Sequence, residues 1–500
     1  MPLWRTPVIS SRISKGFLDT SWVLLVNVIS VLTNIATFLL FANYLGPSLF
    51  GIFSYALAFG AIPAQAASLG FECVVVMNCS RDEKTLGPEL GNSLLVMTTL
   101  SALCITGTYV VMNLVGVPAV TVGVVTIITA SLCINSIADP LLSSTFRVMQ
   151  QIRLPWLLLL LGKIAFLGAV AAVMHMKWSL QAASWLHLAC NVAMCIAMLC
   201  LALAKICPSL DFGLLRRNLI AGLTFCANQL VSLARAGAPQ IILERLGALA
   251  AVGEFAAAFR LANAAAIVPS ALQTVFLPRF HAAKTDSQLT SWFLRIHRII
   301  VVFAFLVAGL IFWCACDIIR LLLRGDFSQS IWVSQILAFS MVLNFASFPY
   351  SMLAEAMRKL KERLIVQAIS AAVTVVACVL LTPKWGAFGA AWAAVIGWAA
   401  MFVLYQPITS PLRGRVSDML YLPKAAIAAA VASIAAYTVF RTLHPGAFRL
   451  LAILVSYSLI YTCACLITRC ITIDDVAGMR SSRQQPARED EPLESVCSDV

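Results

Sequence analysis

Long apolar segments dominate this chain, and short connectors that carry charges, proline or glycine separate them. The segments recur at intervals of about 20 to 25 residues, the length of helix that crosses the hydrocarbon core of a bilayer. Hydrophobic residues make up 61% of the 500 residues and charged residues only 11%, and the mean hydropathy is +0.91. A water-soluble protein of this size needs a charged surface, so the composition predicts an integral membrane protein.

Backbone amides inside a membrane must be satisfied within their own segment, so each crossing segment is expected to be an α-helix. The pattern predicts an all-α integral membrane protein with about 14 transmembrane helices. Two pseudo-symmetric six-helix bundles around a central cleft are expected, at residues 1–205 and 219–408, joined by a cytoplasmic linker at 206–218. Two additional transmembrane helices (409–470) and a polar, disordered cytoplasmic tail (471–500) follow.

The distribution of basic residues sets the expected orientation of the chain, whose net charge is +13. With the amino terminus inside, roughly 25 Lys and Arg fall on the cytoplasmic side and about 7 outside, as the positive-inside rule requires. Arg216, Arg217 and the basic run at 358–363 lie in such inside connectors. Basic charge that sets topology argues against nucleic acid as a partner, and both termini are predicted to be cytoplasmic.

Cysteine and histidine give no sign of a metal site or a catalytic centre. The 16 Cys are scattered without a C-x-x-C pair, and the 5 His form no set with metal-ligand spacing. Every expected outside connector is short, whereas a membrane glycan polymerase or ligase needs a large external loop with catalytic residues. The chain is therefore expected to be no enzyme and to hold no cofactor or metal.

The two predicted bundles look like copies of one another. A shift of 201 residues lays Asn27 on Asn228, and one extra residue in the second copy then lays Gly51 on Gly253. The offset spans an even number of helices, so both copies enter the membrane from the same side. A pseudo-two-fold axis along the membrane normal is therefore predicted, with a shared site between the halves near the midplane.

Polar side chains inside the membrane are costly, so the few that fall within spans are functional candidates. Within each span they share one helical face, at spacings such as i, i+4 and i+7. Guanidinium groups pair with phosphate oxygens, and amides and hydroxyls suit sugar hydroxyls, so these stripes fit a central hydrophilic cleft for an anionic cargo. The candidate substrate-binding residues are Asn27, Asn34, Lys163, Asn228, Ser232, Arg235, Arg260 and Asn263.

Structural roles for the same charges are an open alternative, because an internal ion pair also satisfies a charge inside a membrane. Lys163 could instead extend its ammonium group along its flexible side chain to the membrane surface. The ion pairs that the sequence allows are Arg260 with Glu254, Arg235 with Glu244, and Asp317 with Arg320.

Three segments carry a resemblance to a known family. Residues 41–60, F-A-N-Y-L-G-P-S-L-F-G-I-F-S-Y-A-L-A-F-G, resemble the first helix pair of bacterial polysaccharide flippases, and residues 252–280 carry the matching pattern in the second half. Residues 382–394, T-P-K-W-G-A-F-G-A-A-W-A-A, are similar to a later junction of the same family. The resemblance covers most of the chain and indicates the polysaccharide transporter (oligosaccharide/O-antigen flippase) family of the MOP (multidrug/oligosaccharidyl-lipid/polysaccharide) exporter superfamily.

The resemblance implies a flippase that moves a polyprenyl-diphosphate-linked oligosaccharide, the precursor of an O-antigen, capsule or exopolysaccharide. Movement from the cytoplasmic to the outer face of the bacterial inner membrane by alternating access is expected. The implied partners are a lipid-linked oligosaccharide of the undecaprenyl diphosphate type, membrane lipid, and polysaccharide polymerase or export machinery. The alternatives are a cation-coupled multidrug exporter of the same superfamily, which the basic membrane charges disfavour, and a membrane glycan polymerase or ligase.

Overall fold

A computed structural model describes residues 8–79, 85–149, 151, 153–281, 283, 285–323, 327–411 and 420–470. The expected tail at 471–500 lies outside these residues. All regular structure in the described part of the chain is helical, which confirms the all-α class. The helices are α1 (Val8–Ser68), α2 (Phe71–Cys79), α3 (Leu86–Leu114), α4 (Ala119–Ser136), η2 (Ile137–Leu142), α5 (Ser143–Val148), α6 (Arg153–His175), α7 (Leu180–Leu203), α8 (Phe212–Arg245), α9 (Leu249–Asn263), η3 (Ala264–Ala266), α10 (Ile267–His281), α11 (Asp286–Leu322), α12 (Ser328–Ala356), α13 (Leu360–Thr409), α14 (Tyr421–Thr442) and α15 (Ala447–Ile467).

Helix α1 consists of two segments that fold back on each other at Gly46. This residue has a φ of 68°, in the left-handed region that glycine adopts without strain. Across the break the rings of Phe38 and Phe50 lie 5.2 Å apart. Twelve residues of continuous helix would separate these positions by about 18 Å, so the chain reverses direction at the glycine.

Helix α13 reverses in the same way at Gly386, where φ is 54°. The hydroxyl of Ser370 before the break donates a hydrogen bond of 2.8 Å to the carbonyl oxygen of Gly397 after it. In the described part of the chain, 12 helices are long and apolar enough to cross a membrane. Dividing α1 and α13 at their glycines gives about fourteen segments, in agreement with the expected fold.

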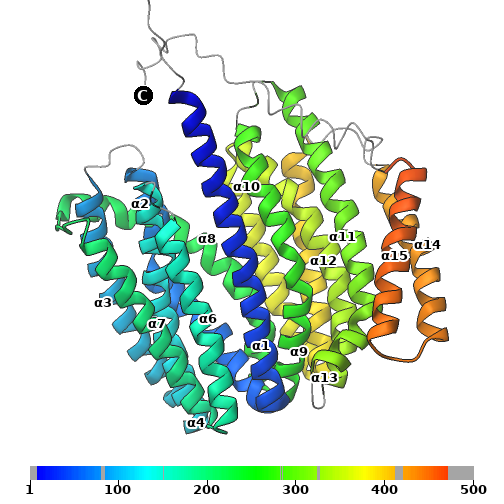
Figure 1. The fold of residues 1–500 in the computed structure, drawn as a ribbon, viewed down its shortest axis with the longest axis horizontal. Helices are drawn as coiled ribbons and strands as arrows, with labels where there is room; N and C mark the ends of the chain where they lie inside the picture. The colour runs from blue at the N-terminus through cyan, green and yellow to red at the C-terminus, as the bar shows by residue number, and fades with distance from the viewer. Residues whose placement is uncertain are drawn as a thin grey trace, which may run out of the picture.

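The helices pack as two neighbouring groups, with a helix pair at one edge (Figure 1). In the first group α1 packs against α3, α4 and α6, and α4 packs against α7. In the second group α12 packs against α9, α11 and α13, and α13 packs against α8. The pair α14 and α15 packs against α11, and α1 joins the groups through contacts with α8 and α9.

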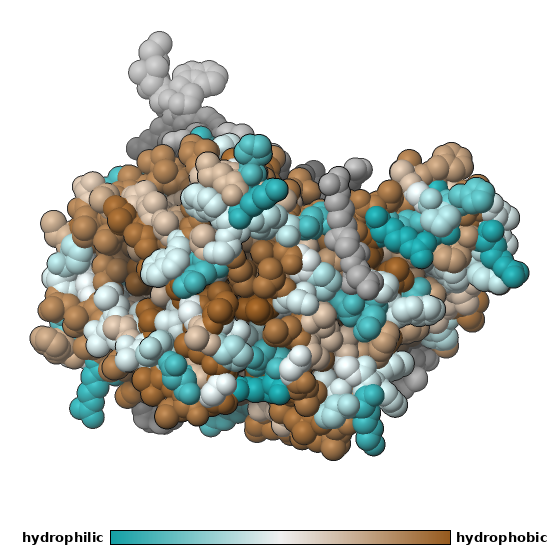
Figure 2. Space-filling model, turned by 90° about the horizontal axis from the view of Figure 1, so that it is seen from below, coloured by the Kyte–Doolittle hydropathy of each residue, from teal (hydrophilic) through white to brown (hydrophobic). Residues whose placement is uncertain are grey.

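One end of the bundle gathers the reversal of α1 with two other connections. Asn43 donates a hydrogen bond of 2.8 Å to the carbonyl oxygen of Leu322, and the Tyr44 hydroxyl donates one of 2.7 Å to that of Trp178. We call this the distal end, because it lies opposite the start of α1 in Figure 1. Seen from this end, apolar side chains cover much of the surface and polar ones form separate patches (Figure 2).

The linker between the two groups is fastened to α3 at the opposite end. The Asn92 side chain donates to the carbonyl oxygen of Asp211 at 2.8 Å and accepts from its amide at 3.2 Å. Glu89, which is fully buried, accepts hydrogen bonds from Asn78 at 2.7 Å and from Asn218 at 2.5 Å. Helix α8 therefore begins attached to the first group, although its later part packs on α13 of the second.

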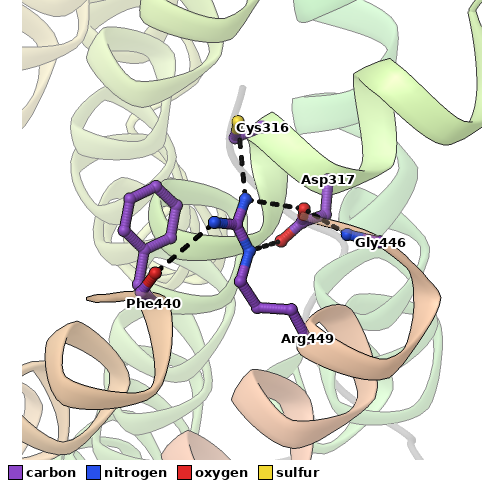
Figure 3. A network of polar contacts seen from close by, with 5 residues as sticks. All are labelled: Cys316, Asp317, Phe440, Gly446 and Arg449. Atoms are coloured by element: carbon purple, nitrogen blue, oxygen red, sulfur yellow. Dashed lines mark hydrogen bonds and ion pairs between the residues drawn. The ribbon is translucent and has the colours of Figure 1, made fainter. Parts of the chain in front are cut away.

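A buried ion pair holds α15 against α11 (Figure 3). The Nε and Nη2 atoms of Arg449 donate to the Asp317 carboxylate at 2.8 and 2.7 Å, and the two residues are 4% and 0% exposed. The amide of Gly446 donates to the same carboxylate at 3.2 Å, and the guanidinium lies 4.2 Å from the Phe440 ring centroid. The expected pairing of Asp317 with Arg320 is wrong, because Arg449 forms a bidentate pair with the carboxylate and Arg320 is exposed.

Replacing Arg449 with alanine leaves the Asp317 carboxylate buried without its bidentate partner. Breaking a buried pair in this way costs about 3–5 kcal/mol, so the unfolding temperature of the protein in detergent should fall. Arg320→Ala removes an exposed arginine one turn from the same carboxylate and should leave that temperature nearly unchanged. Replacing both partners (Asp317→Leu with Arg449→Met) should recover most of the loss, and an equal loss from the control would contradict the assignment.

Candidate functional site

A cavity of about 480 Å³ lies between the two groups of helices. Its walls come from both segments of α1, from α8 and α9, and from the end of α11. Most of the lining is apolar. The polar residues in it are Asn34, Ser54, Gln240, Arg260 and Asn263.

Arg260 provides the only charge among the described residues that line the cavity. Its side chain is exposed although α9 lies between neighbouring helices, because the guanidinium faces the open space. The guanidinium carbon lies 5.0 Å from the ring centroid of Phe38. No ion pair joins Arg260 to Glu254 in the described part of the chain, so the structure does not show the alternative structural role for this arginine.

Neutral hydrogen-bonding groups from three helices share the cavity wall with this cation. Asn34 comes from the first segment of α1, Gln240 from α8, and Asn263 from the last turn of α9. Ser54, from the second segment of α1, is 2% exposed, and its hydroxyl has no hydrogen-bond partner among the described residues. One positive charge with amide and hydroxyl neighbours suits an anionic group that is attached to a polar, uncharged body.

Arg235 lies away from this cavity, between α8 and α13. Its guanidinium carbon is 3.6 Å from the ring centroid of Trp398, and its Nη1 lies 3.1 Å from the sulfur of Met401. Glu244 forms its ion pair with Arg245 at 3.9 Å, so the alternative pairing of Arg235 with Glu244 is also absent from the described residues. The face of Trp398 and a thioether stabilise this cation within the second group.

The other predicted residues are not brought into the cavity wall. Asn228 and Ser232 are half-buried on α8 and, like Arg235, do not belong to its cavity-lining face. Lys163 is half-buried on α6, in the first group, and the side chain of Asn27 lies outside the described residues. The cavity therefore brings together Asn34, Arg260 and Asn263 of the eight candidates.

Sequence reasoning missed two polar residues of the wall, Gln240 and Ser54. Gln240 follows Leu233 and Ala236 at i+7 and i+4 along the face of α8 that does line the cavity. A single amide at the end of an apolar face gives a weak signal. The hydroxyl of Ser54 gives a weaker one, because serine is common in membrane helices.

Comparison with known proteins identifies the family. A family model described as "Polysaccharide biosynthesis protein" matches residues 18–284, which is more than half of the chain. The chain belongs to this family. The matched part includes α1, α8 and α9, and thus most of the cavity wall of this polysaccharide biosynthesis protein. No curated protein sequence matches the chain significantly.

Solved structures with the same fold are transporters. The lipid II flippase MurJ in an inward closed conformation is 14% identical, with a TM-score of 0.68, covering 91% of this chain and 99% of MurJ. An inward-facing multidrug resistance MATE family transporter of the MOP superfamily is 16% identical, with a TM-score of 0.66, covering 77% of this chain and 94% of its own. The MATE multidrug transporter DinF-BH is also 16% identical, with a TM-score of 0.56. The family model thus confirms the expected polysaccharide family, and these structures show that the chain shares the fold of MurJ and of MATE transporters of the MOP superfamily.

Replacing Arg260 with methionine should leave the stability of this polysaccharide biosynthesis protein unchanged or raise it. The guanidinium has no ion pair with any described residue, and removing a partly desolvated charge from the cavity also removes the free-energy cost of holding that charge there. Unfolding of the purified protein in detergent measures the change. A loss as large as that of Arg449→Ala would instead mean that Arg260 holds the bundle together.

Proposed function

We propose that this protein is a flippase that moves a polyprenyl-diphosphate-linked oligosaccharide across the bacterial inner membrane. The observation that carries the proposal is Arg260, which has no ion-pair partner among the described residues and faces a cavity between two groups of helices. An ionisable residue at membrane depth is expected to serve a substrate or ion pathway when it has no protein partner. The membership of the polysaccharide biosynthesis family supports a glycan as the cargo.

In this proposal the diphosphate of the cargo binds Arg260. A guanidinium group can donate two parallel hydrogen bonds to phosphate oxygens, which fixes the position of the anion as well as its charge. The amides of Asn34, Gln240 and Asn263 face the same space and bind hydroxyl groups of the first sugars. The polyprenyl chain stays in the lipid, where its burial needs no protein groups.

The direction of transport follows from the proposed topology. Arg216 and Arg217 begin α8 at the end opposite to the distal end, and the basic run at 358–363 connects α12 and α13 there. The positive-inside rule makes that end cytoplasmic and the distal end the outer face. The two groups of helices then rock about the cavity to expose Arg260 first to one side and then to the other.

Arg260 is the first contact for the anion in this conformation. Arg235 stacks on Trp398, and Lys163 and Asn228 are not among the cavity-lining residues, so none of them reaches a diphosphate bound beside Arg260. We therefore assign the recognition of the anionic group to one arginine and that of the glycan to the surrounding amides.

A multidrug exporter is the second candidate, because MATE family transporters share the fold. The charge of the cavity separates the two candidates. A cationic drug would meet the positive charge of Arg260 and no carboxylate among the described residues that line the cavity, which is unfavourable in a medium of low dielectric constant. An anionic lipid-linked cargo would instead be attracted by the positive charge of Arg260.

Arg260→Gln should lower polymer export about 10- to 100-fold at equal protein level, the range that loss of a charged hydrogen bond predicts. Arg260→Lys should retain part of the activity, because the ammonium keeps the charge but not the bidentate geometry. Export is measured as surface polysaccharide, together with accumulation of undecaprenyl-linked glycan inside the cells. Arg320→Gln, an exposed arginine outside the cavity, is the matched control.

Unchanged export in Arg260→Gln cells would refute the assignment of the anion site. Cells of the deletion strain and of the Arg260→Gln strain are also grown with cationic drugs. Equal drug sensitivity of the deletion strain and the parent, with a loss of surface polymer, is expected for the flippase. A loss of drug resistance with normal surface polymer would favour the multidrug exporter instead.

A further inference from the structure

The second segment of α1 crosses α9 at two glycines, Gly51 and Gly253. A Cβ atom on Gly51 would lie 1.9 Å from the carbonyl oxygen of Leu249, and one on Gly253 would lie 2.1 Å from that of Pro47. Each of these Cβ positions is also 3.2 Å from the backbone nitrogen of the opposite glycine. Both clashes are with backbone atoms, which no change of rotamer can relieve, so only glycine fits at either position.

The contact is reciprocal. The offset that lays Gly51 on Gly253 in the predicted duplication also lays Pro47 on Leu249. Gly51 approaches the carbonyl oxygen of Leu249, and its repeat equivalent Gly253 approaches that of Pro47, the repeat equivalent of Leu249. Such a reciprocal pair is the pattern of a two-fold contact. The axis expected between the two halves accordingly passes between Gly51 and Gly253.

The crossing lies on the distal side of the cavity. Helix α9 begins at Leu249, so Gly253 is about one turn from its distal start, and Gly51 is about one turn from the reversal at Gly46. On these two helices the residues that line the cavity, such as Ser54 and Arg260, follow in the next turns toward the opposite end, whereas the end of α11 lines the cavity as far as Leu323 at the distal end. The crossing thus closes the distal side of the cavity between α1 and α9, beside the end of α11 that the Asn43 hydrogen bond to Leu322 ties to α1.

We propose that Gly51 and Gly253 form the distal gate of the cavity. The two helices touch at the glycines in this conformation and separate when the cavity opens to the outer face. This inference rests on the proposed function because it assumes alternating access, and it adds the residues that close the path. Close backbone contact at small residues gives dispersion and Cα–H···O attraction that falls off steeply as the helices part, so the contact has two well-separated states.

The gate has a direct consequence for substitutions at these positions. A methyl group on either glycine forces the helices apart in the closed state, whereas it meets no obstacle once they have separated. Gly51→Ala and Gly253→Ala should therefore shift the population toward the form that is open on the distal side.

Thiol labelling from outside tests this shift. Ala61, half-buried in the cavity wall, is replaced by cysteine in the full-length protein. Spheroplasts are treated with a membrane-impermeant maleimide, and mass spectrometry of the peptide that contains position 61 measures its labelling apart from the native cysteines. Gly51→Ala with Gly253→Ala should raise the labelling rate about tenfold, as expected when overpacking destabilises one of two states.

Two other glycines provide matched controls. A Cβ atom on Gly107 of α3 or Gly168 of α6 would meet nothing within 4 Å. Gly107→Ala and Gly168→Ala should therefore leave the labelling rate at position 61 unchanged. An unchanged rate in the Gly51 and Gly253 variants, or an equal rise in the controls, would overturn the proposed gate.

A cross-link tests the gate if the alanine variants do not reach the membrane. Ser48 and Ala250 are exposed repeat equivalents that directly follow the two contacting carbonyl residues. Ser48→Cys and Ala250→Cys, joined by a short reducible bismaleimide, should stop polymer export, and reduction of the linker should restore it. Full export by cross-linked protein would show that the crossing does not open.

The labelling assay keeps this inference separate from the proposed cargo, because it needs no substrate. Normal export in Arg260→Gln cells together with a raised labelling rate in the glycine variants would refute the anion site and retain the gate. Lost export in Arg260→Gln cells together with an unchanged labelling rate in the glycine variants would retain the anion site and refute the gate.

Discussion

A guanidinium group, that of Arg260, has no carboxylate partner in the part of the chain that the structure describes, and this determines how the centre of the molecule must be built. Such a charge at membrane depth costs several kcal/mol unless water or an anion solvates it, so the helices around Arg260 cannot close into solid packing. The cavity between the two groups of helices satisfies this requirement. In the proposed gate, closure takes place at the distal end instead, where the backbones of α1 and α9 touch at Gly51 and Gly253.

At the edge of the bundle, by contrast, an arginine side chain has its charge paired within the protein. Arg449 is almost fully buried, and its charge is neutralised by Asp317, the amide of Gly446 and the face of Phe440. A charge that is fully matched by protein groups holds α15 in place and offers nothing to a ligand. The contrast with Arg260 separates a structural arginine from one that is left for a cargo.

The lengths of the apolar segments predicted the class and the approximate number of helices, because hydrocarbon thickness leaves few alternatives. Spacing also showed correctly that Arg260 and Asn263 share one face of α9. It could not show which way a face points. Asn228 and Arg235 share a face of α8 too, but packing against Trp398 on α13 turns that face away from the cavity. Orientation of this kind depends on contacts between segments that lie more than 150 residues apart in the sequence.

The MATE and MurJ structures share this fold at only 14 to 16% identity. Apolar side chains are largely interchangeable in lipid, so the packing of the helices can persist while most residues differ. Close contacts such as that at Gly51 constrain the backbone far more tightly than the residues that face lipid. Under the proposed function, the choice of cargo in this chain depends on the few polar groups in the cavity wall, among which Arg260 carries the charge.

Helix α8 is attached to both groups of helices. Hydrogen bonds from Asn218 to Glu89 and between Asp211 and Asn92 clamp its beginning to the first group, whereas Arg235 is packed on Trp398 in the second. Any rotation of one group against the other must therefore be absorbed within the intervening turns of one continuous helix. If the two groups move relative to one another, the resulting strain therefore falls on the turns of α8 between Asn218 and Arg235.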